Sequence, residues 1–305
     1  MKVLISGGGG YIGSNLLNKI IDKSEAVGVL GRKNNLSVQS EKIDFYEADI
    51  TQPIKIELKH QYDVFIHLAA ANDIDSLDPK TAMLTTVLGT KYCLDLCKAN
   101  GINKFIYFST FQVYGKVSGV MNEETVLEPV NDYAITHMQA EDYVKMFSRT
   151  TSIKHIIVRP TNIYGAPVNK DIDRWTLVPN CFCKEAVEKK TITLMSSGKQ
   201  TRDFIDLNDL SNVTIMLCES FADYENTIVN GASGNNFTIV EIAGIVKEIY
   251  EDKYNEECKL VIKSDQPLEA NQVSISTDMI TKSGFSLSGK ESIRAEISRI
   301  FNLLK

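Results

Sequence analysis

The first thirteen residues, Met-Lys-Val-Leu-Ile-Ser-Gly-Gly-Gly-Gly-Tyr-Ile-Gly, constrain the fold more than any other segment of this chain. Residues 2–6 form a short apolar run typical of a buried parallel strand. Gly7, Gly10 and Gly13 follow at G-x-x-G-x-x-G spacing, and apolar residues then recur at helical spacing from Ile12 onward. A strand, a glycine turn and a helix are the parts of a dinucleotide-binding unit, in which the helix N-terminus offers N–H donors to a pyrophosphate. The alternative, a merely flexible glycine-rich loop, does not explain the flanking strand and helix patterns.

Strand and helix signals alternate through the first half of the chain. Apolar strand patterns recur at residues 26–30, 43–46, 64–68, 105–108 and 155–158, and helical patterns lie between them, notably at residues 83–98 and 133–147. Alternating β and α segments predict a parallel sheet with helices on both faces. We therefore expect an α/β protein with a Rossmann-type, doubly wound parallel sheet.

The regular alternation of strand and helix patterns ends after residue 167. Helical patterns then occur at residues 177–189, 209–218 and 239–250, with strands at 192–194 and 227–230 and a final helix from about residue 290. This half predicts a smaller α/β lobe. We expect residues 1–164 to form the dinucleotide-binding domain and residues 165–305 to form mainly this second lobe, for which the family resemblance described below implies substrate binding. The two interleave, because residues of about 203–231 are expected to return to the first domain.

Composition excludes several classes of protein. The 305 residues carry a net charge of −6, which provides no basic surface for nucleic acid. No run of about 18 apolar residues occurs, so we expect no transmembrane helix and no membrane partner. The N-terminus enters the first strand at once and leaves no room for a signal peptide, so we expect a cytoplasmic protein. The six cysteines and four histidines make no metal-type cluster, and we expect no bound metal and reduced thiols.

Several motifs along nearly the whole chain belong together. They are Ser6-Gly7-x-x-Gly10-x-x-Gly13, Asp49-Ile50, His67-Leu68-Ala69-Ala70, Ser109-Thr110, Tyr114-Gly115, Tyr133 with Glu141, Arg159-Pro160-x-Asn162-Ile163-Tyr164-Gly165, and Gly198-x-x-x-Arg202-Asp203. Together they resemble the extended short-chain dehydrogenases/reductases, the NAD-dependent epimerase/dehydratase family that modifies nucleotide-activated sugars. The resemblance implies a first lobe that binds NAD(H) or NADP(H) and a second that binds a sugar nucleotide.

The resemblance also implies roles for individual residues. Tyr133 matches the catalytic acid/base, and Thr110 matches the hydroxyl that hydrogen-bonds the reacting sugar oxygen. Asn162 and Arg202 match substrate contacts, and the Arg202 guanidinium suits a diphosphate; a surface ion pair with a neighbouring aspartate is the alternative for Arg202. The residues predicted to contact the cofactor, including three that depart from the family pattern (Arg32, Lys33 and His137), are Gly7, Gly10, Tyr11, Ile12, Gly13, Arg32, Lys33, Asp49, Ile50, Leu68, Ala69, Ala70, Ser109, Tyr133, His137, Pro160 and Ile163.

One departure from the family pattern lies four residues after Tyr133. The family usually has a lysine there that holds the nicotinamide ribose and lowers the pKa of the tyrosine, whereas this chain has His137. A free phenol has a pKa of about 10. Oxidation of a sugar alcohol needs the phenolate, and reduction of a keto-sugar needs the protonated phenol. Loss of the lysine therefore favours a reductase, and a degraded site or a merely packed His137 are the alternatives.

A second departure lies after the second strand. NAD-dependent members usually place an acidic residue there for the ribose 2′-hydroxyl, whereas this chain has Gly31, Arg32 and Lys33. A cation can pair with a 2′-phosphate, so NADP(H) is favoured, with NAD(H) still possible. The alternative is that Arg32 and Lys33 are charged loop residues that contact only solvent.

These features narrow the reaction. Phe111 and Gln112 follow Thr110 where dehydratases usually carry acids, so dehydration is disfavoured. We expect an NADPH-dependent 4-keto-sugar reductase with Tyr133 as general acid. The alternatives are a nucleotide-sugar 4-epimerase with bound NAD and, from another class, a catalytically degraded NADP-binding regulator. Helices like those at residues 83–98 and 133–147 form the dimer contact in the family, so we also expect a homodimer.

Overall fold

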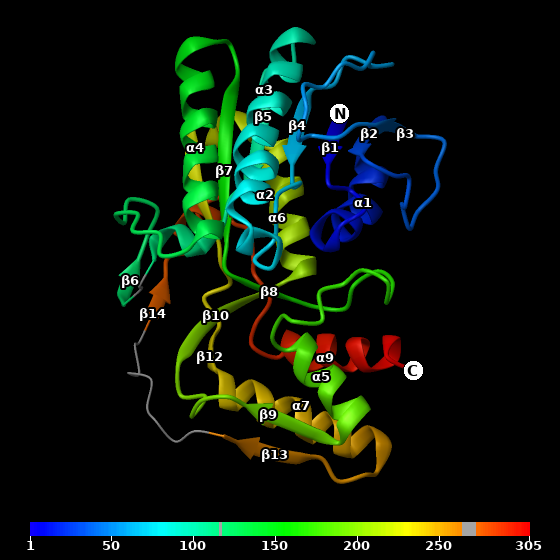
Figure 1. Ribbon diagram of the computed structural model, residues 1–305, viewed down its shortest axis with the longest axis vertical. Helices are drawn as coiled ribbons and strands as arrows, with labels where there is room; N and C mark the ends of the chain where they lie inside the picture. The colour runs from blue at the N-terminus through cyan, green and yellow to red at the C-terminus, as the bar shows by residue number, and fades with distance from the viewer. Residues whose placement is uncertain (116–117, 264–272) are drawn as a thin grey trace. The chain divides into compact units, whose positions relative to one another are not determined.

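The computed structural model describes residues 1–115, 118–263 and 273–305 (Figure 1). The chain forms two compact units, each assembled from three segments. Unit 1 comprises Met1–Lys116, Glu124–Pro160 and Ser211–Val229, and unit 2 comprises Val117–Glu123, Thr161–Leu210 and Asn230–Lys305. Residues 161–164 thus belong to unit 2, and residues 211–229 belong to unit 1. Which unit binds a dinucleotide and which binds substrate stays a prediction.

Unit 1 is built around a seven-stranded sheet with the order β11-β7-β5-β4-β1-β2-β3. Its strands are β1 (Lys2–Ser6), β2 (Ala26–Gly31), β3 (Ile43–Glu47), β4 (Val64–His67), β5 (Lys104–Phe108), β7 (Lys154–Pro160) and β11 (Thr227–Gly231). The first six pair in parallel, and this strand order reverses direction beside β1, as in doubly wound folds. The expectation of a Rossmann-type sheet is confirmed. The parallel register places Ser6 opposite both Leu30 and His67, so the carboxyl ends of three strands meet.

Helices cover both faces of this sheet, which explains its continuous apolar strands. They are α1 (Tyr11–Lys23), α2 (Pro79–Ala82), a π-helical segment (Met83–Leu88), α3 (Gly89–Ala99), α4 (Asp132–Thr150) and α6 (Leu207–Glu219), with 3₁₀ turns at Asp75–Leu77, Phe111–Tyr114 and Phe221–Tyr224. Helices α3 and α4 lie side by side over one face (Figure 1) and share a buried core with Phe65, Phe105 and Ile157. Lys19 Nζ of α1 donates to Asn212 Oδ1 of α6 at 2.8 Å, so these two helices are also neighbours.

The described residues of unit 2 form three small sheets and a hydrophobic core of their own. The strands form a three-stranded sheet of β8 (Asn162–Tyr164), β10 (Thr201–Asp206) and β12 (Asn236–Thr238), and two pairs, β9 (Thr191–Leu194) with β13 (Lys259–Ile262) and β6 (Gly119–Met121) with β14 (Val273–Ile275). The helices are α5 (Asn180–Lys189), α7 (Ile239–Tyr254), α8 (Asp278–Thr281) and α9 (Ser292–Leu303). Side chains of α5, α7 and α9 pack into one buried cluster with strand residues such as Ile192 and Phe204.

Two features of unit 2 differ from the sequence prediction. The helix expected at residues 177–189 begins at Asn180, because a proline disfavours helical backbone at the residue before it and Pro179 stands in the helix-capping position. The strands β6, β8, β10, β12, β13 and β14 were not predicted. In the described ranges, none of the helices has the length and apolarity needed to cross a membrane. All six cysteines are described and are free thiols.

Candidate active site

The glycine turn joins β1 to α1. Gly7 has a left-handed φ of 76°, and a Cβ there would stand 2.9 Å from the Ala69 amide nitrogen. A Cβ on Gly13 would stand 2.1 Å from the Gly7 carbonyl oxygen, so a side chain at either position would displace backbone. Gly10 caps α1, whose first turn carries no acidic residue. The N–H groups at this helix end therefore face no nearby carboxylate from their own turn, which suits an anionic ligand.

A chain of buried hydrogen bonds supports the loop after β4. The Ala69 amide donates to Ser6 Oγ at 3.3 Å, and Ser6 Oγ lies 2.6 Å from His67 Nδ1. His67 Nε2 lies 3.1 Å from Thr90 Oγ1, which itself donates to the Thr86 carbonyl at 2.6 Å. Burial, and to a smaller extent electrostatic interaction with His137, lowers the pKa of His67 to about 3. His67 is therefore neutral near pH 7, and through Ser6 Oγ it ties the Ala69 backbone to the end of β1.

The residues predicted to meet the adenosine end lie after β2 and β3. Arg32 and Lys33 are exposed directly after β2. Asp49 accepts hydrogen bonds from the Thr51 amide and hydroxyl at 2.9 and 2.8 Å, and these bonds hold its pKa below the usual value. Ile50 is 9% exposed and contacts the position of Gly89 in α3.

Sequence reasoning missed Asn35 in this region. The Oδ1 atom of Asn35 would lie 2.3 Å from a Cβ on Gly9, so the amide side chain covers the glycine turn. An asparagine four residues after the end of a strand gives no signal by spacing alone.

Tyr133 and His137 stand one turn apart at the start of α4. Asn131 caps this helix by accepting from the Ala134 amide at 2.8 Å. The rings of Tyr133 and His137 meet edge to face, with centroids 4.7 Å apart and an interplanar angle of 65°. Tyr133 is half-buried, whereas His137 is only 2% exposed.

Tyr107 of β5 forms a hydrogen bond with the His137 ring. The Tyr107 hydroxyl lies 2.8 Å from His137 Nδ1. The other ring nitrogen, Nε2, is buried and has no hydrogen-bond partner within the described ranges. Burial lowers the pKa of His137 to about 4 against the opposing effect of Glu141, so the imidazole is neutral near pH 7. Sequence reasoning missed Tyr107, although a tyrosine in an otherwise apolar strand signals a hydroxyl that needs a buried partner.

Ser109 and Thr110 follow directly after β5, and both side chains are buried. Its hydroxyl accepts from the Gln112 amide at 3.2 Å and so opens the 3₁₀ turn Phe111–Tyr114. Asn131 Nδ2 donates to Gln112 Oε1 at 3.1 Å. The turn that carries Thr110 is thus tied to the N-terminus of the helix that carries Tyr133.

A buried ion pair joins the same turn, α4 and β7. Arg159 Nε and Nη2 donate to the two carboxylate oxygens of Glu141 at 2.8 and 2.6 Å, and Arg159 Nη1 donates to the Tyr114 hydroxyl at 2.9 Å. Lys145 adds a third bond to Glu141 at 3.1 Å. Burial alone would raise the pKa of Glu141, but the bonds from Arg159 hold it below the usual range. This cluster explains why Tyr114, Glu141 and Arg159 occur together with Tyr133.

The remaining predicted residues are Pro160 at the end of β7, and Asn162, Ile163 and Arg202 in unit 2. Asn162 Nδ2 donates to the Asp203 carbonyl at 2.8 Å, and Ile163 pairs with Ile205 between β8 and β10. Arg202 is exposed on β10, and no ion pair joins it to any described residue. Asp203 and Asp206 instead accept hydrogen bonds from hydroxyl and amide groups, so the surface ion pair considered for Arg202 is not formed with either aspartate.

Trp175 also lies in unit 2. Its indole N–H donates to the Lys170 carbonyl at 3.3 Å, and its ring packs on the unit 2 core.

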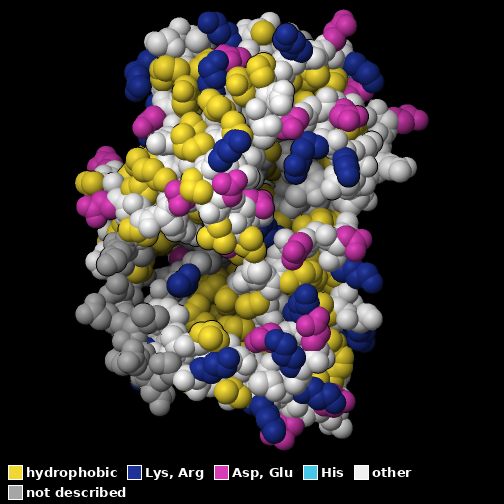
Figure 2. Space-filling view, viewed as in Figure 1, with side chains coloured by type: hydrophobic (Ala, Val, Ile, Leu, Met, Phe, Trp, Pro, Cys, Tyr) yellow, Lys and Arg dark blue, Asp and Glu magenta, His cyan; other side chains and the backbone are white. Residues whose placement is uncertain are grey.

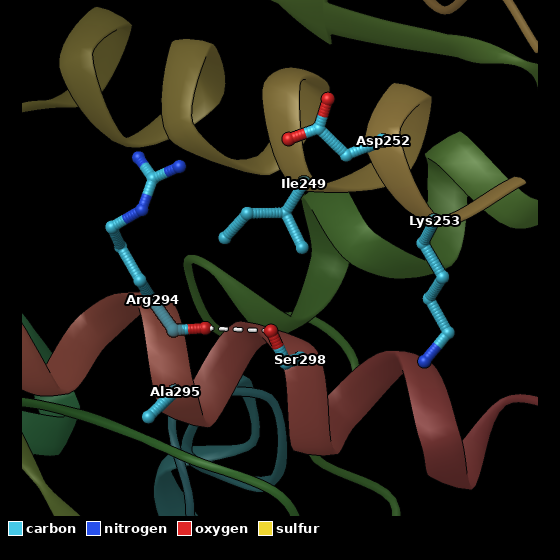
Figure 3. Close-up of a pocket in the computed structure, with 6 residues that line it drawn as sticks. All are labelled: Ile249, Asp252, Lys253, Arg294, Ala295 and Ser298. Atoms are coloured by element: carbon cyan, nitrogen blue, oxygen red, sulfur yellow. Dashed lines mark hydrogen bonds between the residues drawn. The ribbon is translucent and has the colours of Figure 1, made fainter. Parts of the chain in front are cut away.

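A shallow groove of about 460 Å³ also lies in unit 2, between α7 and α9 (Figure 3). Ile249 lies between the cations Arg294 and Lys253 in this view. Arg294 forms an ion pair with Glu248 at 2.7 Å, and Lys253 donates to Asn302. The groove contains none of the residues predicted to be functional.

The strand order and the glycine turn define a doubly wound Rossmann-type α/β protein. A model of the "NAD dependent epimerase/dehydratase family" matches residues 3–231. The chain therefore belongs to this family and is an enzyme of it, which confirms the resemblance.

Three known proteins illustrate the similarity. The chain is 25% identical over 314 residues to a putative UDP-glucose 4-epimerase of Methanocaldococcus jannaschii, covering 99% of this chain and 98% of that protein. It is 31% identical over 265 residues to UDP-glucuronic acid decarboxylase 3 of Arabidopsis thaliana, covering 82% and 74%. The solved structure of UDP-glucuronic acid 4-epimerase from Bacillus cereus, in complex with UDP-glucuronic acid and NAD, is similar with a TM-score of 0.83 at 22% identity, covering 99% of this chain and all of that one.

Proposed function

We propose that this enzyme reduces a 4-keto sugar that is attached to a nucleoside diphosphate, using a reduced nicotinamide dinucleotide and Tyr133 as the general acid. The observation that carries the proposal is the buried, neutral His137 in the position where the family usually has a lysine. The UDP-sugars named for the three similar proteins support the substrate class.

The described residues of unit 1 fit a dinucleotide. The turn at Gly7, Gly10 and Gly13 leaves a cradle that a single Cβ would fill, and the N-terminus of α1, which has no side-chain cap, offers its amide donors there. At the opposite end of the proposed site, the buried His137 Nε2 lacks a partner among the described residues and can bond a ribose hydroxyl. When bound, the dinucleotide supplies the hydride.

The chain's own residues then position the substrate and supply its proton. Tyr133 would give its phenolic proton to the oxygen that was the keto oxygen, and Thr110 would hydrogen-bond the same oxygen. Arg202 and Asn162 of unit 2 would hold the nucleotide-sugar, with the guanidinium on phosphate. The loop at Leu68, Ala69 and Ala70 and the strand-end residues Pro160 and Ile163 complete the cofactor contacts that the family resemblance implies.

The direction of the reaction follows from the charge beside Tyr133. A lysine cation would lower the pKa of the phenol, whereas the neutral His137 brings no charge. Ionising an unassisted phenol near neutral pH costs about 4 kcal/mol, because its pKa of about 10 lies about 3 units away. A protonated Tyr133 suits reduction, which needs a proton donor, better than alcohol oxidation, which needs a base.

For the cofactor, we propose NADP(H), bound through its 2′-phosphate by Arg32 and Lys33. Both side chains are exposed directly after β2, and Gly31 stands where an acidic residue would otherwise repel the phosphate. NAD in the Bacillus cereus structure supports the competing choice, NAD(H).

A second candidate is 4-epimerisation with bound NAD, in which the hydride leaves the sugar and returns to the other face. The names of the M. jannaschii and B. cereus proteins favour it. This reaction requires Tyr133 to act first as a base.

One experiment separates these candidates. NADPH and NADH are titrated by calorimetry into cofactor-stripped protein, and 4-keto-6-deoxy sugar nucleotides are then added while the absorbance of the reduced nicotinamide is followed. Tighter binding of NADPH than NADH, lost in Arg32→Ala, with falling absorbance supports the reductase. A reductive rate that rises with pH between about 6 and 9 would contradict Tyr133 as the acid, since the phenol deprotonates over that range. Tight NAD binding and interconversion of UDP-sugars without a net absorbance change would establish the epimerase.

A further inference from the structure

Three aromatic rings form a buried column behind Tyr133 in unit 1. His67 lies against Tyr107 with ring centroids 5.8 Å apart and an interplanar angle of 30°. Tyr107 lies against His137 at 6.0 Å and 31°. All three side chains are at most 2% exposed, so their polar atoms must be satisfied inside the protein or by a ligand.

The first histidine of the column has a complete set of partners. Thr90 uses its own proton on the Thr86 carbonyl, so its oxygen is free to accept from His67 Nε2. His67 Nδ1 then accepts from the Ser6 hydroxyl. One nitrogen donates and the other accepts, which is what a neutral imidazole requires.

His137 differs because only its Nδ1 is satisfied within the described ranges. Burial raises the pKa of Tyr107 well above the usual value, so its hydroxyl keeps one proton, and this hydroxyl also hydrogen-bonds Thr90. Because Thr90 Oγ1 already accepts from His67 Nε2, His137 Nδ1 is the open acceptor, and donation to it at 2.8 Å leaves the imidazole proton on Nε2. Donation to Thr90 instead would place the imidazole proton on Nδ1 and leave Nε2 as a buried acceptor.

We infer that Tyr107 is a positioning residue that holds His137 in the Nε2–H tautomer, so that the site presents a fixed N–H donor for a hydroxyl of the bound dinucleotide. This rests on the proposed function for the identity of the ligand, but not for the tautomer. A lysine ammonium carries three donors and rotates freely, whereas this imidazole offers one donor with a direction set by β5. Tyr107, which is not part of the family motif around Tyr133, thus compensates for the missing lysine by orienting His137.

The test uses the full-length protein labelled with ¹⁵N-histidine. Long-range ¹H–¹⁵N correlation spectra at pH 7 report which nitrogen of each ring carries the proton, and the His137 signals are assigned by their absence in His137→Gln. The wild type is expected to show the Nε2–H tautomer, and NADPH or NADH is expected to shift the Nε2 signal. In Tyr107→Phe we expect a mixture of tautomers and about fivefold to tenfold weaker dinucleotide binding, the effect of one lost hydrogen bond.

Tyr62→Phe is the matched control, because Tyr62 is a tyrosine of unit 1 that is 1% exposed and bonds Tyr46 at 2.9 Å rather than a histidine. It should keep both the tautomer and the affinity. An Nδ1–H tautomer in the wild type overturns the inference, as does a Tyr107→Phe variant that folds and keeps both properties. If neither dinucleotide binds the wild type while the Nε2–H tautomer is found, the proposed function fails but the tautomer stands.

Discussion

The residues proposed for proton transfer in unit 1 and the arginine proposed to bind phosphate in unit 2 are held in opposite ways. In unit 1, His137 and Thr110 are buried and bonded to residues of other elements, and Arg159 locks the surrounding turn and helix together. In unit 2, Arg202 is exposed on β10 and pairs with no described residue. If the proposed function is correct, the groups for proton transfer are in place before a ligand arrives, whereas Arg202 acquires its partner only when the nucleotide-sugar binds.

Charge is also distributed differently. All four histidines lie in unit 1. Unit 1 also buries the ion pair of Glu141 and Arg159, whereas the buried Asp203 of unit 2 accepts hydrogen bonds from hydroxyl and amide groups. Burial raises the pKa of Asp203 against the hydrogen bond from Thr161. Hydrophobic side chains gather on the surface of unit 1 over α3 and α4 (Figure 2). Met146 of α4 is 37% exposed, and Met83 of the π-helical segment that precedes α3 is 42% exposed. This surface is consistent with the homodimer expected from the sequence, which stays a prediction.

The largest effect is expected for the proposed acid. Tyr133→Phe removes the proton donor but keeps the ring against His137, so turnover should fall about a thousandfold, within the range typical of general acid catalysis. NADPH and NADH affinities should change little. Turnover within a few fold of the wild type would show that unit 1 does not contain the acid at Tyr133.

The next prediction compares the ion pairs of the two units. Arg159→Leu leaves the Glu141 carboxylate buried without its bidentate partner, so the free energy of unfolding should fall by about 3 kcal/mol or more. Arg294→Leu breaks an exposed pair with Glu248 in unit 2, with side chains 45% and 57% exposed, and should cost less than about 1 kcal/mol. Urea unfolding measures both. Equal losses would show that the buried cluster is no more important than a surface pair.

Acid should destabilise the protein through its buried histidines. The pKa values of folded His67 and His137, about 3 and 4, lie below the unfolded value, so the unfolded state binds more protons and stability falls as pH drops from 6.5 toward 4. Each histidine should contribute a loss of about 2 kcal/mol between pH 7 and pH 5. Asp203 contributes to the pH dependence with the opposite sign. Its pKa is raised in the folded state, so its protonation at low pH removes the cost of burying a charge and stabilises the fold.

Urea unfolding at the two pH values checks this. His137→Gln should remove about one histidine's share of the loss, while Tyr62→Phe should keep the whole of it. An unchanged pH dependence in His137→Gln would contradict a neutral, buried His137.

The smallest effect is expected in unit 2. Arg202→Ala should raise the KM for a nucleotide-sugar about tenfold, as expected for one charge-assisted hydrogen bond to phosphate, with little change in kcat. Lys199→Ala, three residues away, is a control for loss of positive charge. If both variants raise the KM equally, Arg202 contributes only to the positive electrostatic potential of the surface and does not bind the phosphate directly.

Much of unit 1 could be predicted because its strands are buried on both faces and appear as continuous apolar runs. The strands of unit 2 gave weaker signals. In β13, three of the four side chains are exposed, and β6, β8, β12 and β14 have three residues each, too few to establish a period.

The candidate site shows a similar limit. Gly7, Gly13, Tyr133 and His137 were recognised because they lie at short, regular spacings. Tyr107 lies 30 positions before His137, and the bond between them depends on how α4 packs on β5, which spacing does not encode. Pairings of this kind follow from tertiary packing rather than from local pattern.

The division of unit 1 into three segments has a consequence for biosynthesis. As the chain leaves the ribosome, six of the seven strands of the large sheet are present once β7 is complete at Pro160. Strand β11, which borders β7, emerges only after the whole of residues 161–226, most of which build the other unit. Until then β7, with Ile156, Ile157 and Val158 at its centre, is an unpaired edge that can pair with another chain. We therefore expect slower translation between residues 161 and 226 to increase aggregation of the nascent protein.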